Sequence, residues 1–387
     1  MMNTIEIVNA WHQEITTWRH TLHSMPEVGF ELHNTSQYVA NKLESWGIRI
    51  DRSFGQTGIV GIIDGTLGEG RTIAYRADMD ALPMQDQTGQ LYASQNPGMA
   101  HACGHDGHMA MLLATARYFS ENRDFRGRII FLFQPAEEIG AGAKAMMEDG
   151  LFEQYPFDEV YGFHNMPRLP ENTISLRYGP ITGAGEKFRL IVRGCSGHSS
   201  VPHKCINPIT ISAKIITAWQ SIVSECVPCS EMGVLAVTKI MSGEVFNSIP
   251  ESAEAGGTIR FYEREVGKTL RRKMQLLASS IAEAYDAEAE VLFEVLCPAT
   301  VNTPEQVDCV IDVAKQTVGA ENLNTNVEPS PGGEDMAFFK KDDNIGACFF
   351  MIGSKGTNLH TCDFDFDDSI IPLGVTMLCR IAKQRLV

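Results

Sequence analysis

The stretch His101-Ala-Cys-Gly-His-Asp-Gly-His108 gathers three histidines, a cysteine and an aspartate within eight residues. A second stretch, Phe131-Leu-Phe-Gln-Pro-Ala-Glu-Glu138, runs from an apolar segment into two adjacent carboxylates. Thiolate, imidazole and carboxylate groups are the side chains that bind zinc and related divalent metals in proteins. A carboxylate that is not a ligand can move protons. Together the two stretches indicate a metal-dependent hydrolase.

Each of these two stretches, which carry the candidate metal-binding side chains, lies next to a predicted helix or strand. A helix is expected at 109–119, directly after the first stretch, because its apolar residues recur every three or four positions. Buried strands are expected at 72–75, 128–133 and 160–164, and acidic or histidine side chains follow each of them. Ligands of open α/β sheets bind beyond the carboxyl ends of the strands. We therefore expect these side chains to meet at one edge of a sheet.

The N-terminal region shows two helical patterns and then two strand patterns. Apolar spacing predicts two helices within 4–48, and Gly47 ends the second. A strand is expected at 58–63, and Asp64-Gly65 is typical of a tight turn between it and the strand at 72–75.

The chain has the length and the element order of two domains, one inserted into the other. Glycines and a proline at 179–185 indicate a hinge. From 186 to 295 the predicted order is β-α-β-β-α-β, which is typical of a ferredoxin-like domain. We therefore expect an α/β catalytic domain with a central mixed sheet at 1–184 and 298–387. An inserted α+β lid domain is expected at 185–297.

Charge and cysteine content exclude several classes of protein. The net charge is −16, with 48 acidic and 32 basic side chains and no run of Lys or Arg, which argues against nucleic-acid binding. No apolar stretch approaches the roughly 20 residues that cross a bilayer, so no membrane partner is expected. The N-terminus lacks a signal-peptide pattern, and the ten cysteines are expected to be reduced thiols in a cytoplasm.

Five side chains are candidate metal ligands. Cys103 and His105 are close enough in sequence to hold one metal or to straddle two, and the others stand beside predicted strand ends or loops: Glu138, His164 and His360. This set suits zinc, manganese, cobalt or nickel. A histidine standing alone is more often a packed or surface residue, so the ligand hypothesis depends on all five converging.

The adjacent glutamates have different expected roles. Neighbouring side chains of an extended backbone point in opposite directions, so Glu138 is assigned as a ligand and Glu137 as the general base. Asp78 and Asp106 are expected to fix the tautomers of the imidazoles. The glycines at 140 and 142 are a weak dinucleotide signal, because the third glycine of that motif is missing.

These residues also resemble a known family, the M20 metallopeptidases, in the branch of hippurate hydrolase, N-acyl-amino-acid deacylases and plant auxin-conjugate hydrolases. The similarity spans nearly the whole chain, and its strongest motifs are Arg76-Ala-Asp-Met-Asp-Ala-Leu-Pro83, His101–His108 and Gln134-Pro-Ala-Glu-Glu138. Further matching motifs are Leu22–Phe30, Gly197-His198, Pro202-His203, Phe246–Pro250, Gly257–Arg260, Gly332–Asp335 and Leu359-His360.

The resemblance implies a site with two divalent metal ions. Its ligands would be Cys103, His105, Glu138, His164 and His360, with Glu137 as the base. It also implies that His198 in the lid stabilises the oxyanion, that Asn247 and Arg260 hold the substrate's carboxylate, and that the lid mediates a homodimer or tetramer.

The resulting hypothesis is an amidohydrolase of N-acyl-L-amino acids, such as acetyl or benzoyl conjugates, that releases a carboxylic acid and a free amino acid. Two alternatives stay open at this point. One is dipeptide cleavage, because a dipeptide also presents an amide next to a carboxylate. The other is a non-catalytic protein that binds such conjugates.

Overall fold

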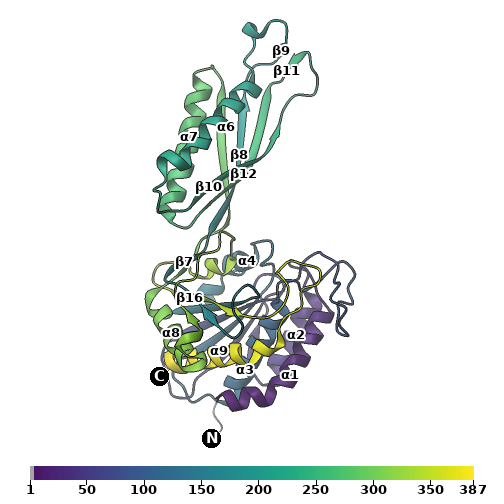
Figure 1. The fold of residues 1–387 in the computed structure, drawn as a ribbon, viewed down its shortest axis with the longest axis vertical. Coiled ribbons are helices and arrows are strands. Elements are labelled where there is room, and N and C mark those ends of the chain that lie inside the picture. The colour runs from purple at the N-terminus through teal and green to yellow at the C-terminus, as the bar shows by residue number, and fades with distance from the viewer. Residues whose placement is uncertain (1–3) are drawn as a thin grey trace. The chain divides into compact units, whose positions relative to one another are not determined.

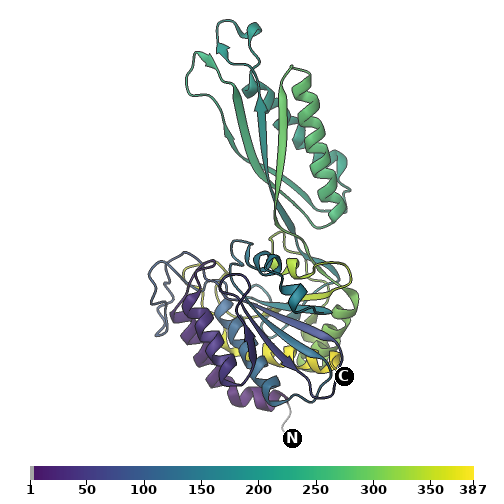
Figure 2. The ribbon, with the colours of Figure 1, turned by 180° about the vertical axis from the view of Figure 1, so that it is seen from behind.

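The computed structural model describes residues 4–387, and it divides into two compact units (Figures 1 and 2). Unit 2 consists of Thr182–Ala299 and Pro329–Glu334, and unit 1 is the remainder of the chain. The first boundary falls inside the segment 179–185, where the sequence indicated a hinge.

Unit 1 is built on an eight-stranded sheet in the order β1-β2-β4-β3-β5-β16-β6-β15. Neighbours from β4 to β16 are parallel, whereas β1, β2 and β4 pair antiparallel and β16 pairs antiparallel with β6, so the expected mixed sheet is confirmed. The strands are β1 (Arg49–Asp51), β2 (Ile59–Asp64), β3 (Thr72–Asp78), β4 (Arg128–Gln134), β5 (Glu159–Met166), β6 (Ile174–Ser175), β15 (Leu323–Asn324) and β16 (Gly346–Gly353).

Alternating side chains of the central strands enter two separate cores. On β4, Phe131 and Phe133 belong to one core, and Ile130 and Leu132 belong to the other. Burial on both faces explains why this strand reads as a continuous apolar run. Helices supply the opposing surfaces: α1 (Thr4–Ser24), α2 (His33–Ser45), α3 (His105–Glu121), α8 (Pro304–Val318) and α9 (Ile371–Arg385) on the first core, and α4 (Gly142–Glu148) and α5 (Leu151–Gln154) on the second.

The turn at Asp64-Gly65 does not join neighbouring strands, which corrects the sequence-based expectation. Strand β4 lies between β2 and β3, pairing antiparallel with the first and parallel with the second. Gly65 is needed for another reason, because a Cβ there would lie 2.0 Å from the carbonyl oxygen of Phe125. Its N–H donates to the carbonyl of Gly127 at 2.9 Å, which packs this turn against the segment that leads into β4.

Unit 2 has the predicted ferredoxin-like arrangement. Its antiparallel sheet has the order β10-β12-β8-β13, and α6 and α7 pack together on the sheet through a core that contains Phe188 and Trp219. The elements are β8 (Ala184–Arg193), α6 (Pro208–Cys226), β10 (Gly233–Met241), β12 (Ser252–Phe261), α7 (Arg264–Glu283) and β13 (Glu288–Cys297). A small two-stranded sheet joins β9 (Gly197–His198) to β11 (Ser248–Ile249).

Unit 2 begins three residues before and ends two residues after the predicted limits of the insert, and a separate segment also belongs to it. Residues 329–334 were expected in the catalytic domain, but the backbone N–H of Gly183 donates to the carbonyls of Ser330 and Gly332, both at 2.9 Å. The hydroxyl of Tyr262 also donates to the carbonyl of Pro329 at 2.8 Å. The next segment forms a 3₁₀ helix, η3 (Asp335–Phe339).

Across residues 4–387, no helix combines the length and the apolar character that crossing a bilayer requires.

Candidate metal centre

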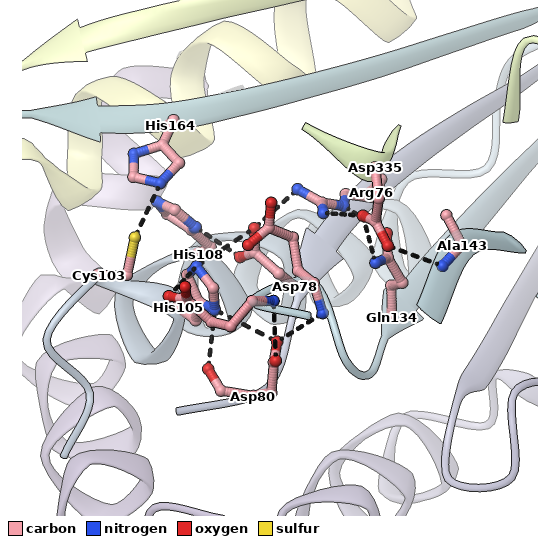
Figure 3. Close-up of polar contacts among 12 residues, drawn as sticks. Arg76, Asp78, Asp80, Cys103, His105, His108, Gln134, Ala143, His164 and Asp335 are labelled. Atoms are coloured by element: carbon pink, nitrogen blue, oxygen red, sulfur yellow. Dashed lines mark hydrogen bonds and ion pairs between the residues drawn. The ribbon is translucent and has the colours of Figure 1, made fainter. Parts of the chain in front are cut away.

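The stretches 101–108 and 131–138 come together in unit 1 beside the carboxyl ends of β3 and β5 (Figure 3). Cys103 and His105 flank Gly104, whose φ is +93°. Helix α3 begins at His105. A Cβ at Gly104 would lie 2.3 Å from Asn165 Oδ1, so only glycine allows this loop to approach the end of β5. The close approach brings Cys103 next to His164.

All five ligand candidates converge. Cys103 Sγ lies 3.3 Å from His164 Nε2. Cys103, His105 and His164 offer ligand atoms that all lie within 4.8 Å of one another, and so do Cys103, Glu138 and His360. Glu137 forms a third such group with His105 and Glu138. The two ligand groups share Cys103, an arrangement that two neighbouring cations can occupy.

Hydrogen bonds fix the tautomers of two imidazoles. His105 Nδ1–H donates to the carbonyl of Asp80 at 2.8 Å, and His164 Nδ1–H donates to the carbonyl of Asn165 at 2.6 Å. A carbonyl oxygen can only accept, so in the neutral form of each ring Nε2 carries the lone pair that a metal requires.

Two ligand candidates each have a buried atom without a hydrogen-bond partner among residues 4–387, namely His105 Nε2 and Glu138 Oε1. Buried polar atoms without a partner are rare, and here both belong to ligand candidates. A thiol, three imidazoles and a carboxylate that converge in this way fit divalent transition metals.

Asp78 lies beside the ligand candidates and orients a histidine that the sequence analysis left unassigned. Its Oδ1 lies 2.7 Å from His108 Nδ1, and its Oδ2 accepts from Arg76 Nη1 at 2.7 Å and lies 3.6 Å from His105 Nε2. His108 Nε2 lies 2.7 Å from Asn165 Oδ1, so both of its ring nitrogens are engaged. His108 therefore supports the centre without offering a free ligand atom.

Asp106 does not contact the ligand imidazoles, contrary to expectation. Its Oδ2 lies 2.8 Å from His23 Nδ1 and accepts from Arg19 Nη1 at 3.4 Å. The carboxylate follows His105 immediately, but the first turn of α3 directs it toward α1. Asp106 thus ties these two helices together.

A buried polar network that the sequence did not predict lies behind Asp78 (Figure 3). Arg76 Nε donates to Gln134 Oε1 at 2.8 Å, and Arg76 Nη2 donates to Asp335 Oδ1 at 3.1 Å. Gln134 Nε2 donates to the same Asp335 oxygen at 2.7 Å. Arg76, Gln134 and Asp335 each lie in a motif that carries the resemblance, but nothing in the sequence indicated that their side chains contact one another.

Burial controls the protonation of the ligand candidates. It lowers the pKa of His164 to about 3, so this imidazole stays neutral. Burial raises the pKa of the Cys103 thiol above its usual range and also raises the pKa of Glu138. For His105, burial opposes the charged form, but Asp78 and Cys103 outweigh it and raise the pKa. Because metals bind the thiolate and the neutral imidazole, metal binding here releases protons.

The three substrate-contacting candidates of unit 2, His198, Asn247 and Arg260, lie in two separate regions of that unit. His198 on β9 pairs with Ser248 on β11, and the carbonyl of Asn247 accepts from Ser199 N at 3.0 Å, so His198 and Asn247 are neighbours. Arg260 pairs with Gly185 near the opposite end of β12. Eight residues separate Ser252 from Arg260 along that strand, which corresponds to about 26 Å.

Comparison with known proteins identifies the fold and its relatives. The model of "Peptidase family M20/M25/M40" matches residues 74–384. The chain is 35% identical to a hippurate hydrolase of Campylobacter jejuni over 385 residues, covering 100% of both chains. It is 33% identical to an N-acetylcysteine deacetylase of Bacillus subtilis, covering 96% of this chain and 97% of the relative.

Among solved structures, a Bacillus subtilis protein described as a dinuclear metal binding peptidase from the M20 family has a TM-score of 0.85 and 31% identity. The similarity covers 98% of this chain and 99% of that one. With the family model matching residues 74–384 and full-length relatives above 30% identity, the chain belongs to peptidase family M20/M25/M40.

Proposed function

We propose that this protein is a metal-dependent amidohydrolase that cleaves N-acyl-L-amino acids to a carboxylic acid and a free amino acid. The observation that carries the proposal is the convergence of five metal-ligand side chains next to the carboxylate of Glu137. Relatives that are named for hydrolysis of hippurate and for deacetylation of N-acetylcysteine support this substrate class.

The residues that would hold two divalent cations are Cys103, His105, Glu138, His164 and His360. Manganese, zinc, cobalt and nickel all accept such a mixture of sulfur, nitrogen and oxygen ligands. When bound, the cations would polarise the amide carbonyl and lower the pKa of the attacking water.

The protein's own groups would then move the protons. Glu137 takes one proton from the attacking water and delivers it to the amide nitrogen. The carbonyl carbon gains the water oxygen, the C–N bond breaks, and the amino acid leaves as a free amine. Asp78 holds His108 and lies next to His105, so its role is to orient the imidazoles.

In unit 2, His198 would stabilise the oxyanion, and Arg260 and Asn247 would bind the substrate's carboxylate. Asn247 precedes β11, which ends three residues before Ser252, the first residue of β12, whereas Arg260 lies about 26 Å further along that strand, so these groups do not reach one small substrate together. We therefore propose that a homodimer forms through unit 2 and that His198 and Asn247 serve the partner's centre.

The test of the function is a panel of N-acyl-L-amino acids with acetyl and benzoyl groups, assayed after loading with each candidate metal. Glu137→Gln keeps the shape of the side chain but removes the base, so kcat should fall by about 10²–10⁴-fold. Metal content, measured by elemental analysis, should stay near two ions per chain.

Unchanged turnover by Glu137→Gln would remove Glu137 from its assigned role. Cleavage of dipeptides in preference to acetylated amino acids would change the proposed substrate class. Tight binding of the conjugates without cleavage at any metal loading would refute catalysis itself.

We also propose a reducing compartment such as the cytoplasm. All ten cysteines are free thiols in the structure, including the exposed Cys195 and Cys229.

A further inference from the structure

We propose that Asp80 is the positioning residue of this centre, and that its carboxylate holds the backbone from which Glu137 and Glu138 project. The inference rests on the proposed function, because it concerns the base and a ligand of that same centre. Asp80 is not itself among the ligand candidates, and it lies two residues beyond the end of β3 (Figure 3).

One carboxylate accepts both backbone amides of the glutamate pair. Glu137 N–H donates to Asp80 Oδ1 at 3.0 Å, and Glu138 N–H donates to Asp80 Oδ2 at 3.1 Å. Asp80 is 1% exposed, so water does not compete for either oxygen. Hydrogen bonds to an ionised acceptor are stronger than neutral ones. Each glutamate therefore has its own oxygen as an anchor.

The main chain of Asp80 orients a third member of the centre. Its carbonyl accepts the Nδ1–H of His105 at 2.8 Å. The other ring nitrogen, Nε2, is therefore free to point at the metal-ligand cluster. The residues before and after Asp80 are also held, because Met79 N–H donates to Gln134 O at 2.8 Å and Ala81 N–H donates to Glu27 O at 2.7 Å. Asp80 is thus fixed on both sides before it contacts the centre.

The backbone that Asp80 holds needs an anchor. Ala136, just before the glutamates, has a φ of +54°, a left-handed conformation that costs energy for any residue except glycine. The carbonyl of Ala136 accepts from Ala141 N at 3.1 Å and from Gly142 N at 3.2 Å, which closes the turn on its far side. The two hydrogen bonds to Asp80 hold the other side of this turn, at the backbone of Glu137 and Glu138.

An aspartate is required here because two N–H donors point at one side chain. An asparagine has the same shape but only one acceptor oxygen, and its NH₂ group would face the second N–H. Asp80→Asn should therefore displace one glutamate without touching the carbonyl contact to His105. Cys103 and His164 should keep their positions, since neither contacts Asp80.

The experiment is a metal titration of the metal-free full-length protein, without substrate, comparing wild type with Asp80→Asn. Cobalt(II) is the probe, because its absorption reports a bound thiolate. We expect one of the two cobalt ions to bind 10–100-fold more weakly, the usual effect of losing a group that orients ligands. The thiolate band should remain, because Cys103 is unaffected. At saturating metal, kcat should fall while KM stays close to wild type.

Asp86→Asn is the matched control. Asp86 is another buried carboxylate that accepts two backbone N–H groups, from Thr88 at 2.8 Å and from Ser94 at 2.7 Å, but neither donor belongs to the centre. This variant should lose stability without losing cobalt affinity. Equal cobalt affinity in Asp80→Asn and wild type would overturn the inference, and so would an equal loss in both variants.

Ala136→Gly added to Asp80→Asn provides a rescue, because glycine adopts the left-handed turn without an anchor. The double variant should regain part of the cobalt affinity, and no recovery would contradict the anchoring role. The crystal structure of metal-free Asp80→Asn should show the Glu137-Glu138 backbone displaced, and an unmoved backbone would refute the inference. The cobalt titration and the crystal structure use no substrate, so these two readouts are independent of whether N-acyl amino acids are cleaved.

Discussion

At the scale of single residues, the metal centre depends on groups that were easy to recognise and on one that was not. Cys103 and His105 were recognisable by type and spacing, and the structure brings them to His164 as expected. Asp80 was expected near the site only as an acidic residue after a strand, because the sequence does not record that its carboxylate accepts backbone N–H groups from residues 57 and 58 positions away. Ligands are recognisable by chemistry, whereas the residues that orient them are defined only by the fold.

Gly104 gives a prediction at this scale. Gly104→Ala places a Cβ 2.3 Å from Asn165 Oδ1 at a φ of +93°, so it combines a steric clash with left-handed strain. We expect a loss of unfolding free energy of more than about 2 kcal/mol and weaker metal binding, since Cys103 and His105 flank the glycine. Urea denaturation and metal titration measure the two effects.

Gly98→Ala is the matched control for Gly104→Ala. Gly98 has a φ of +78°, but a Cβ added there would meet open space, with nothing within 4 Å. It should cost about 1 kcal/mol and leave metal affinity unchanged. Equal losses in the two alanine variants would show that the contact with Asn165 is unimportant.

At the scale of elements, long periodic segments were predicted well and pairings were not. Helix α3 contains the predicted residues 109–119, because its apolar spacing is continuous. The pairing of β2 with β4 was missed, because the strands at 58–63 and 72–75 are adjacent in sequence and only a turn signal links them. Local periodicity specifies an element, but the choice of neighbour depends on which faces the rest of the sheet buries.

A buried ion pair between Arg385 of α9 and Glu159 at the start of β5 predicts that the stability of the protein depends on pH. Glu159, 1% exposed, accepts hydrogen bonds from Arg385, Arg71 and Tyr161. Burial opposes the charged form of Glu159, but Arg385 and Tyr161 outweigh it and lower its pKa. This carboxylate therefore stabilises the fold above the ordinary glutamate pKa of about 4.3, and the contribution disappears as pH falls through the lowered pKa.

Glu159→Gln should lower the unfolding free energy at pH 7 by about 3 kcal/mol, because it leaves Arg385 without its buried partner. The difference from wild type should shrink as the pH is lowered below 4, and urea titrations across that range would measure it. Glu305→Gln is the control, since Glu305 contacts the same arginine but is 60% exposed, and it should cost less than about 1 kcal/mol. A difference that does not change with pH would contradict the assignment to the Glu159 charge.

At the scale of the whole molecule, the order of elements was enough to identify an insert but not all of its residues. The β-α-β-β-α-β order of unit 2 is visible in the sequence. The segment 329–334 is not, because its backbone groups make the contacts: Ser330 O accepts from Gly183 N, and Pro329 O accepts from the Tyr262 hydroxyl. Backbone groups are the same in every residue, so such a contact leaves no compositional trace.

The proposed homodimer predicts complementation between two inactive variants. His198→Ala and Glu137→Gln should each have low activity, but subunits mixed under reversible dissociation form heterodimers. If His198 serves the partner's centre, one centre of each heterodimer has both groups intact, and the mixture should recover about one quarter of wild-type activity. Analytical ultracentrifugation would verify the dimer. Recovery should be absent if His198 acts within its own chain.

The chain leaves unit 1 through β7 (Gly179–Thr182) and returns through β14 (Thr300–Asn302), and these two strands are hydrogen-bonded to each other. Neighbouring entry and exit points mean that an insert of almost any size can be accommodated without stretching the host. The five ligand candidates all belong to unit 1, so replacing the insert by another module of the same attachment points leaves the ligand cluster intact.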